Sequence, residues 1–187
     1  LGMKVLEVGC GWGGLARWMA GRHGVQVTGV TVSVEQAKLA RCRCADLPID
    51  IEVRDYRELE GQFDRIVSVG MFEHVGQRNY QTFFSKTRSL LKDQGLFLLH
   101  TIGAGRDGFA TDRWIEKYIF PNGVLPPAPA LARQADAFFT IEDWHSFGAD
   151  YDPTLMAWYR NFNDAWPTLK AHYGDRFKRM FEYYLLV

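Results

Sequence analysis

Short apolar runs alternate with amphipathic stretches along the first hundred residues. The runs are rich in β-branched residues and predict strands over 3–8, 25–31, 49–53, 63–70 and 96–100. Helical spacing between them predicts helices over 15–22, 33–44 and 80–91. Ser33 is a suitable N-cap, and Gln36 stands where a capping box requires it. Strands alternating with helices predict an α/β fold, with a mostly parallel sheet covered on both faces.

The pattern changes after Gly103. Residues 104–136 contain four prolines among glycines and aromatic residues, which predicts an irregular insertion or lid. It is expected to be packed, because Trp114 and Phe120 need burial. A sixth strand is predicted over 137–141, and aromatic-rich helices over 153–187. The length suits one catalytic domain over 1–187.

Composition narrows the classes of function. Lys+Arg and Asp+Glu both number 22, so no basic footprint points to nucleic acid. The three cysteines have no metal-binding spacing and indicate free thiols in a reducing cytoplasm, without a metal site. No apolar run reaches the roughly 18 residues of a membrane-spanning helix. The chain starts without Met and stops in apolar sequence, so we expect both ends to be truncations of a longer protein.

The first strand runs into the glycine-rich segment Gly9-x-Gly11-x-x-Gly14. This spacing suits a dinucleotide or S-adenosylmethionine. A nicotinamide enzyme needs an acid at the end of the second strand to hold the ribose, and Val30-Thr31-Val32 stands there. Glu7 would repel a pyrophosphate but attract a cationic ligand. The loop therefore favours S-adenosylmethionine, while a dinucleotide or an unliganded structural turn stays open.

Several longer motifs follow in one order along the chain: VLEVGCGWGGLARWMA, GVTVSVEQ, DYRELEGQFDRIVSVGMFEHVG, LLHTIG, KYIFPNG and EDWHSFGADYD. Together they closely resemble cyclopropane-fatty-acyl-phospholipid synthases and, more distantly, mycolic acid cyclopropane synthases. The resemblance implies the Rossmann-like fold of class I S-adenosylmethionine-dependent methyltransferases, with an insertion after the fifth strand. It also implies an N-terminal region and a final antiparallel strand that this chain does not contain.

The reaction implied by the resemblance adds a methylene group from S-adenosylmethionine to a cis double bond in an unsaturated phospholipid. Methyl transfer leaves a carbocation that water would trap, so the site has to exclude water. Aromatic faces stabilise positive charge without acting as nucleophiles. Aromatic residues gather around the insertion, which suggests an acyl tunnel; ordinary core packing is the alternative.

The resemblance also implies a base that removes a proton from the new methyl group, namely a bound bicarbonate ion. Its implied ligands are Glu73, His100, the backbone of Ile102, and Tyr151. A carboxylate beside an anion is reasonable if Glu73 orients His100 or accepts the bicarbonate O–H. The family uses a further, upstream cysteine, which Cys10 does not replace. His74 is interpreted as a packed histidine.

Cofactor contacts are implied in the same way. The amino acid part is expected to lie against the first loop, made of Val5, Leu6, Glu7, Val8, Gly9, Cys10, Gly11, Trp12 and Gly13. The ribose and adenine are expected to face Thr31, Val32, Ser33 and Gln36. Asp55 can accept a hydrogen bond from the adenine amine, and Tyr56 can stack on the ring.

A phospholipid substrate implies peripheral binding at the inner, cytoplasmic face of the membrane. Basic residues near the end alternate with aromatic ones and could meet anionic headgroups: Lys170, Arg176, Lys178 and Arg179. A solvated helix face is the alternative. A homodimer stays open. Two other functions also stay open, a small-molecule N- or C-methyltransferase on the same scaffold and an inactive cofactor-binding fragment.

Overall fold

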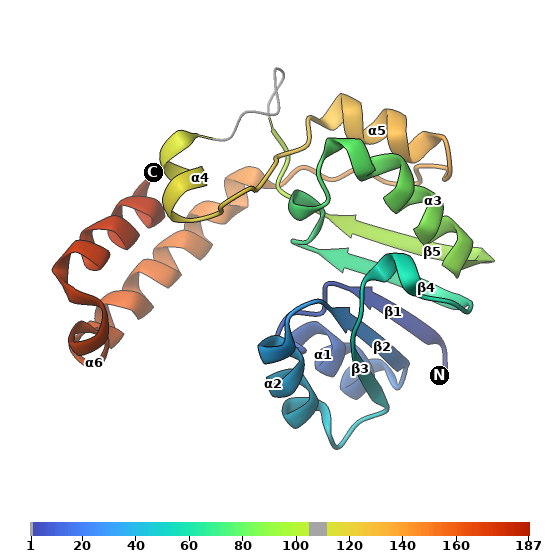
Figure 1. Cartoon of the computed structure of the whole chain (residues 1–187), viewed down its shortest axis with the longest axis horizontal. Coiled ribbons are helices and arrows are strands. Elements are labelled where there is room, and N and C mark those ends of the chain that lie inside the picture. The colour runs from blue at the N-terminus through green and yellow to red at the C-terminus, as the bar shows by residue number, and fades with distance from the viewer. Residues whose placement is uncertain (1, 105–111) are drawn as a thin grey trace. The chain divides into compact units, whose positions relative to one another are not determined.

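The computed structural model describes residues 2–104 and 112–187, which form two compact units (Figure 1). The sheet unit comprises the described residues up to 104 together with 122–141. The helical unit comprises 112–121 and 142–187. The two units differ in which residues pack together, which does not test whether 1–187 is one catalytic domain; that stays a prediction.

The sheet unit contains a parallel sheet of five strands in the order β3-β2-β1-β4-β5. The strands are β1 (Lys4–Val8), β2 (Gln26–Thr31), β3 (Ile49–Val53), β4 (Phe63–Val69) and β5 (Leu91–His100). All five predicted strands are confirmed, although β5 begins at Leu91, ahead of Gly95. The chain passes from β3 at one edge to β4 beside β1. This reversal creates a switch point at the carboxyl end of β1, where open α/β sheets bind ligands.

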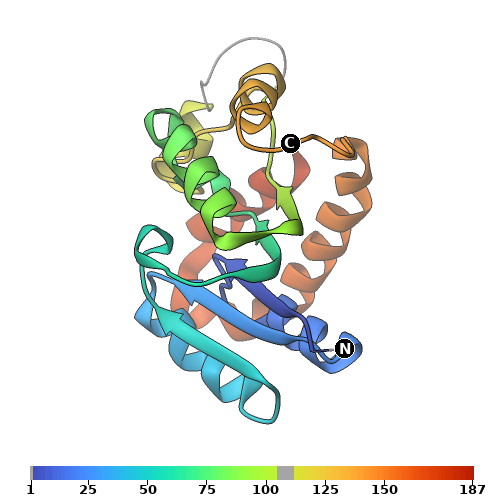
Figure 2. The ribbon, with the colours of Figure 1, turned by 90° about the vertical axis from the view of Figure 1, so that its right-hand side faces the viewer.

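Helices cover both faces of this sheet, as predicted (Figure 2). Side chains of α1 (Gly14–His23) and α2 (Val34–Cys44) pack on the face that carries Val5 and Val27. Side chains of α3 (Tyr80–Leu90) pack on the opposite face with Leu6. Successive residues of a strand point to opposite faces, so β1 contributes to both cores.

The capping box at the start of α2 forms only in part. The Ser33 hydroxyl accepts the backbone N–H of Gln36 at 3.3 Å, as predicted. The Gln36 side chain does not return to Ser33, which corrects the expectation. Instead the Ser33 N–H donates to Thr31 Oγ1 at 3.1 Å, and that hydroxyl donates to Gln36 Oε1 at 3.0 Å. The Thr31 hydroxyl takes the place that the box gives to the glutamine.

The sixth strand predicted over 137–141 is wrong. Helix α5 (Ala128–Asp136) ends there in a turn, in which the backbone N–H groups of Phe138 and Phe139 donate to the Ala135 carbonyl at 2.9 Å. Both rings pack against the core cluster under α3. Adjacent residues of a strand would point to opposite faces, so a strand could not bury both rings there.

The expected irregular insertion over 104–136 is partly helical. Its described residues include α4 (Arg113–Tyr118) and α5, while 105–111 lie outside the described part of the chain. The helix α4 belongs to the helical unit and α5 to the sheet unit. The segment therefore does not form a single body.

The helical unit is built mainly from α6 (Tyr151–Leu186), in agreement with the prediction of aromatic-rich helices. Gly174 interrupts α6 with φ 66° and ψ 166°, and the two halves lie side by side (Figure 1). Phe162 and Trp166 of the first half pack with Leu185 of the second. Among the described residues, no helix is long and apolar enough to span a membrane.

Candidate functional site

The glycine loop joins β1 to α1 at the switch point. Gly9 has φ +83°, and a Cβ there would lie 2.7 Å from Met71 Cγ, so only glycine fits without rearrangement. The backbone N–H groups of Gly9 and Cys10 both donate to the Val30 carbonyl, at 3.0 and 2.9 Å. The loop is thereby held against the end of β2.

The side chain of Glu7 is buried at the start of this loop, with only 4% of its residue surface exposed. Within the part of the chain that the structure describes, its Oε2 atom has no hydrogen-bond partner. Burial raises the pKa of Glu7 to about 8, although the backbone N–H of Ala16 favours the charged form. A buried carboxylate without a countercharge is costly, and a cationic ligand would remove that cost. Glu7 therefore fits the ammonium group of S-adenosylmethionine.

The other predicted residues of the loop divide by exposure. The side chains of Val5, Leu6 and Val8 are buried in the sheet core, where they hold Glu7 in place. Cys10 is also buried, against Ile51. Gly11 and Gly13 have positive φ, and Trp12 is half exposed. Contacts from this loop to a ligand would thus come mainly from its backbone and from Glu7.

The end of β2 gathers the residues predicted to face the ribose and the adenine. Thr31 is buried and bonded to Ser33 and Gln36, as described above. Val32 stands exposed beside them. The Thr31 hydroxyl is the central group of this set, and Gln36 is held by it. Predicting these hydrogen bonds requires knowing where the side chains point, which the spacing of the residues alone does not give.

Asp55 and Tyr56 follow β3, where the short helix η1 (Tyr56–Glu58) begins. Both carboxylate oxygens of Asp55 contact the Arg57 guanidinium, the closer pair at 2.5 Å, and this interaction lowers the pKa of Asp55. Tyr56 is half-buried and meets Phe83 edge-to-face at 5.4 Å. An adenine bound by Asp55 would have to share it with Arg57, a residue that the sequence reasoning missed.

A second cluster lies where β4 and β5 end. Glu73, in the short helix η2 (Phe72–His74), is buried, and its Oε1 accepts the Ile102 backbone N–H at 2.7 Å. Among the described residues, Glu73 Oε2 has no hydrogen-bond partner. His100 ends β5, opposite Val69, and its carbonyl accepts the Gly70 N–H at 3.1 Å. The sheet thus brings three of the four predicted catalytic residues to one edge.

The fourth, Tyr151, begins α6 in the helical unit and meets Trp158 edge-to-face at 6.3 Å. Since it belongs to the other unit, the four-residue set as a whole stays a prediction. His74 is exposed, so its interpretation as a packed histidine is wrong. In η2 the inward position belongs to Glu73, and its neighbour His74 faces outward.

Comparisons with known proteins identify relatives over essentially the whole chain. The family model described as mycolic acid cyclopropane synthetase matches residues 1–187. The chain is 57% identical over 184 residues to the cyclopropane-fatty-acyl-phospholipid synthase of Escherichia coli (strain K12), covering 98% of this chain and 48% of that protein. It is 36% identical to a probable fatty acid methyltransferase of Pseudomonas putida, covering 98% of this chain and 50% of that one. The chain thus spans about half the length of the curated relatives it matches.

Two solved structures share the fold closely. The cyclopropane synthase MmaA2 from Mycobacterium tuberculosis superposes with a TM-score of 0.90 at 26% identity, over 98% of this chain and 71% of that one. The mycolic acid cyclopropane synthase CmaA1, solved with SAH and CTAB, gives 0.89 at 29% identity with the same coverage.

The strand order, the glycine loop and these neighbours define the Rossmann-like fold of class I S-adenosylmethionine-dependent methyltransferases, as the sequence predicted. Within that class, the chain belongs to the mycolic acid cyclopropane synthetase family.

Proposed function

We propose that this protein transfers a methylene group from S-adenosylmethionine to the cis double bond of an unsaturated phospholipid, forming a cyclopropane ring. The observation that carries the proposal is the 57% identity to the Escherichia coli cyclopropane-fatty-acyl-phospholipid synthase, which extends over 98% of this chain. The buried carboxylate of Glu7 beside the glycine loop supports the choice of methyl donor.

In this proposal Glu7 binds the ammonium group of the donor, and the backbone of the loop surrounds its amino acid part. The ribose and adenine face Thr31, Val32, Ser33 and Gln36. Asp55 and Tyr56 contact the adenine, with Arg57 sharing the Asp55 carboxylate. The donor supplies an electrophilic methyl group, and a dry site keeps the resulting carbocation from water.

Ring closure needs a base that removes a proton from the transferred methyl group. We assign this role to a bicarbonate ion held by Glu73, His100, Ile102 and Tyr151. Glu73 Oε2 can accept the bicarbonate O–H, while Oε1 holds the Ile102 backbone. Loss of the proton leaves its electron pair to form the second bond to the carbocation, so no oxidant is required.

The lipid substrate places the reaction at a membrane surface, and we propose peripheral binding at its inner, cytoplasmic face. Four basic residues of α6 support this, because anionic headgroups attract Lys and Arg: Lys170, Arg176, Lys178 and Arg179. Assembly as a homodimer belongs to the same proposal and is tested by sedimentation.

The reaction is tested by incubating the full-length protein with S-adenosylmethionine and unsaturated phospholipid vesicles, followed by mass spectrometry of the acyl chains. Each converted double bond adds the mass of one CH₂ group. Unchanged acyl chains, under conditions where calorimetry detects cofactor binding, would contradict the proposal. Turnover that appears only with the full-length protein would identify the 187-residue chain as an inactive cofactor-binding fragment.

A further inference from the structure

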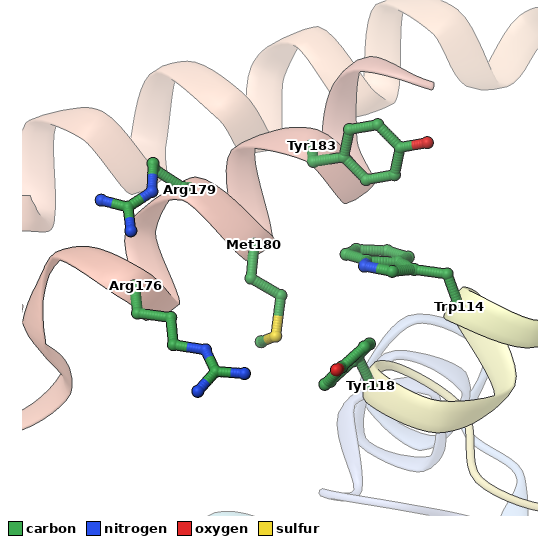
Figure 3. Close-up of a pocket in the computed structure, with 6 residues that line it drawn as sticks. All are labelled: Trp114, Tyr118, Arg176, Arg179, Met180 and Tyr183. Atoms are coloured by element: carbon green, nitrogen blue, oxygen red, sulfur yellow. The ribbon is translucent and has the colours of Figure 1, made fainter.

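The helical unit contains a pocket of about 330 Å³ between α4 and the second half of α6 (Figure 3). Its lining consists of three aromatic residues, one methionine and two arginines: Trp114, Tyr118, Tyr183, Met180, Arg176 and Arg179. None of these six residues belongs to the cofactor loop or to the Glu73 cluster.

One wall of the pocket is aromatic. Trp114 and Tyr118 lie one turn apart on α4, with ring centroids 5.6 Å apart. Trp114 also meets Tyr183 of α6 edge-to-face at 4.7 Å. Met180 points from α6 toward these rings (Figure 3). Such a wall favours the apolar part of a ligand, and the methionine can adapt to its shape.

The other wall is cationic. Arg176 and Arg179 stand three positions apart on α6, so they share one face of the helix. In the described parts of the chain neither arginine forms an ion pair. The acids near them in the sequence pair with lysines instead. Asp175 Oδ1 lies 3.8 Å from Lys170 Nζ, and Glu182 Oε1 lies 3.4 Å from Lys178 Nζ.

Among the described residues, neither guanidinium group has a countercharge; Figure 3 shows that of Arg176 directed toward Tyr118 and that of Arg179 directed away from it. The side chain of Lys117 adds a third cation nearby, with Nζ 5.1 Å from the centre of the Tyr118 ring. Among the described residues, no acid lines the pocket. Guanidinium groups match phosphate oxygens in geometry as well as in charge. The ligand that complements both walls is therefore a phosphate ester with an apolar part.

We propose that this pocket binds the phosphodiester headgroup of a glycerophospholipid. Arg176, which faces the aromatic wall, holds the phosphate, and Arg179 reaches the same phosphate by a change of rotamer. Trp114, Tyr118 and Met180 contact the glycerol and the first methylenes of the acyl chains. A free phosphate ion would leave the aromatic wall unused, and a neutral diacylglycerol would leave both arginines unpaired. The inference rests on the proposed function for the class of substrate, and it assigns these residues to binding.

Calorimetric titration with dihexanoyl phosphatidylglycerol, below its micelle concentration, tests the assignment without requiring turnover. The double variant Arg176→Gln/Arg179→Gln is expected to weaken binding roughly tenfold or more. The matched control is Arg160→Gln, an exposed arginine in the first half of α6 outside the pocket, which is expected to bind like the parent. Dihexanoylglycerol and inorganic phosphate are titrated in parallel, and both are expected to bind much more weakly.

Unchanged binding by the double variant would overturn the assignment. Equal binding of dihexanoylglycerol would reduce the pocket to an apolar surface, and equal binding of inorganic phosphate would make it a simple anion site; either outcome contradicts a headgroup site. If the double variant does not fold, each single Arg→Gln variant is expected to weaken binding severalfold. Cyclopropane formation measured alongside separates the two proposals, because an active protein whose binding ignores both arginines contradicts this inference alone.

Discussion

Glu73 accepts the backbone N–H of Ile102 at 2.7 Å, which ties the segment after β4 to the segment after β5. Only one carboxylate oxygen is used, and in the described residues the other has no hydrogen-bond partner. The N–H of Val124 donates to the Glu73 carbonyl at 2.9 Å and fixes the same residue from its backbone. The position of Glu73 is therefore set from two sides, while one of its oxygens stays available to a ligand.

Replacing Glu73 with Gln is expected to lower turnover by roughly 100-fold, because the amide oxygen can still accept the Ile102 N–H but the NH₂ group that replaces Oε2 cannot accept the bicarbonate O–H. Affinity for S-adenosylhomocysteine, measured by calorimetry, is expected to change little. Glu60→Gln, an exposed glutamate of the same unit, is the matched control. A collapse of cofactor affinity in the Glu73 variant would place this residue in the cofactor site instead.

Cofactor affinity is expected to depend on pH through Glu7. Its pKa is raised to about 8, and a cationic ligand binds the ionised carboxylate. Binding of S-adenosylhomocysteine is therefore expected to tighten as pH rises toward about 8 and then to level off. The Glu7→Gln variant should bind more weakly and lose most of this dependence. A variant that keeps the parent's pH profile would rule out Glu7 as the titrating group.

The raised pKa of Glu7 also makes the free energy of unfolding depend on pH in the absence of cofactor. The unfolded chain loses the Glu7 proton near 4.5, whereas the folded chain keeps it to about 8, so the folded state loses stability as pH rises between these values. Glu7→Gln removes that loss and is expected to be more stable than the parent at pH 9, by on the order of 1 to 4 kcal/mol. Urea unfolding of both proteins at pH 5 and pH 9 measures the difference. A gap that does not widen at the higher pH contradicts the assigned pKa.

Gly9→Ala is expected to destabilise the protein by roughly 1 to 3 kcal/mol, because φ is +83° and the new Cβ would meet Met71 Cγ at 2.7 Å. Gly14→Ala is the matched control from the same loop, since nothing lies within 4 Å of a Cβ there and Gly14 opens α1. The control should equal or exceed the parent in stability, by up to about 1 kcal/mol. Thermal unfolding of the two variants compares them, and equal midpoints would show that the loop can shift away from Met71.

The five strands of the sheet could be predicted because each is a short apolar run bounded by polar residues, proline or glycine. The cluster of Glu73, His100 and Ile102 at one sheet edge followed, since parallel strands end on the same side. What could not be predicted depends on contacts between distant residues. The turn at Phe138 forms because two adjacent rings pack into one core, and a five-residue pattern does not contain that information.

The hydrogen-bond partners of the site's side chains could not be predicted from the sequence either. Asp55 carries the chemistry expected of an adenine contact, yet Arg57 already holds both of its oxygens. Gln36 stands at the capping-box position, but its Oε1 accepts from the Thr31 hydroxyl, which itself accepts the Ser33 N–H that the box gives to the glutamine. Residue type and spacing name the candidates, while the folded backbone decides which partners they meet.

The Val30 carbonyl accepts hydrogen bonds from both Gly9 and Cys10, and the next residue along β2 is Thr31, which holds Ser33 and Gln36. One continuous stretch of backbone therefore joins the part of the site predicted for the amino acid end of the cofactor to the part predicted for its ribose. A small molecule that matches one end of the cofactor and binds at its part of the site restricts the motion of this backbone. The part of the site for the other end is then already ordered. Two fragments that together make up the cofactor are then expected to bind with positive cooperativity, each lowering the entropy that the second has to lose.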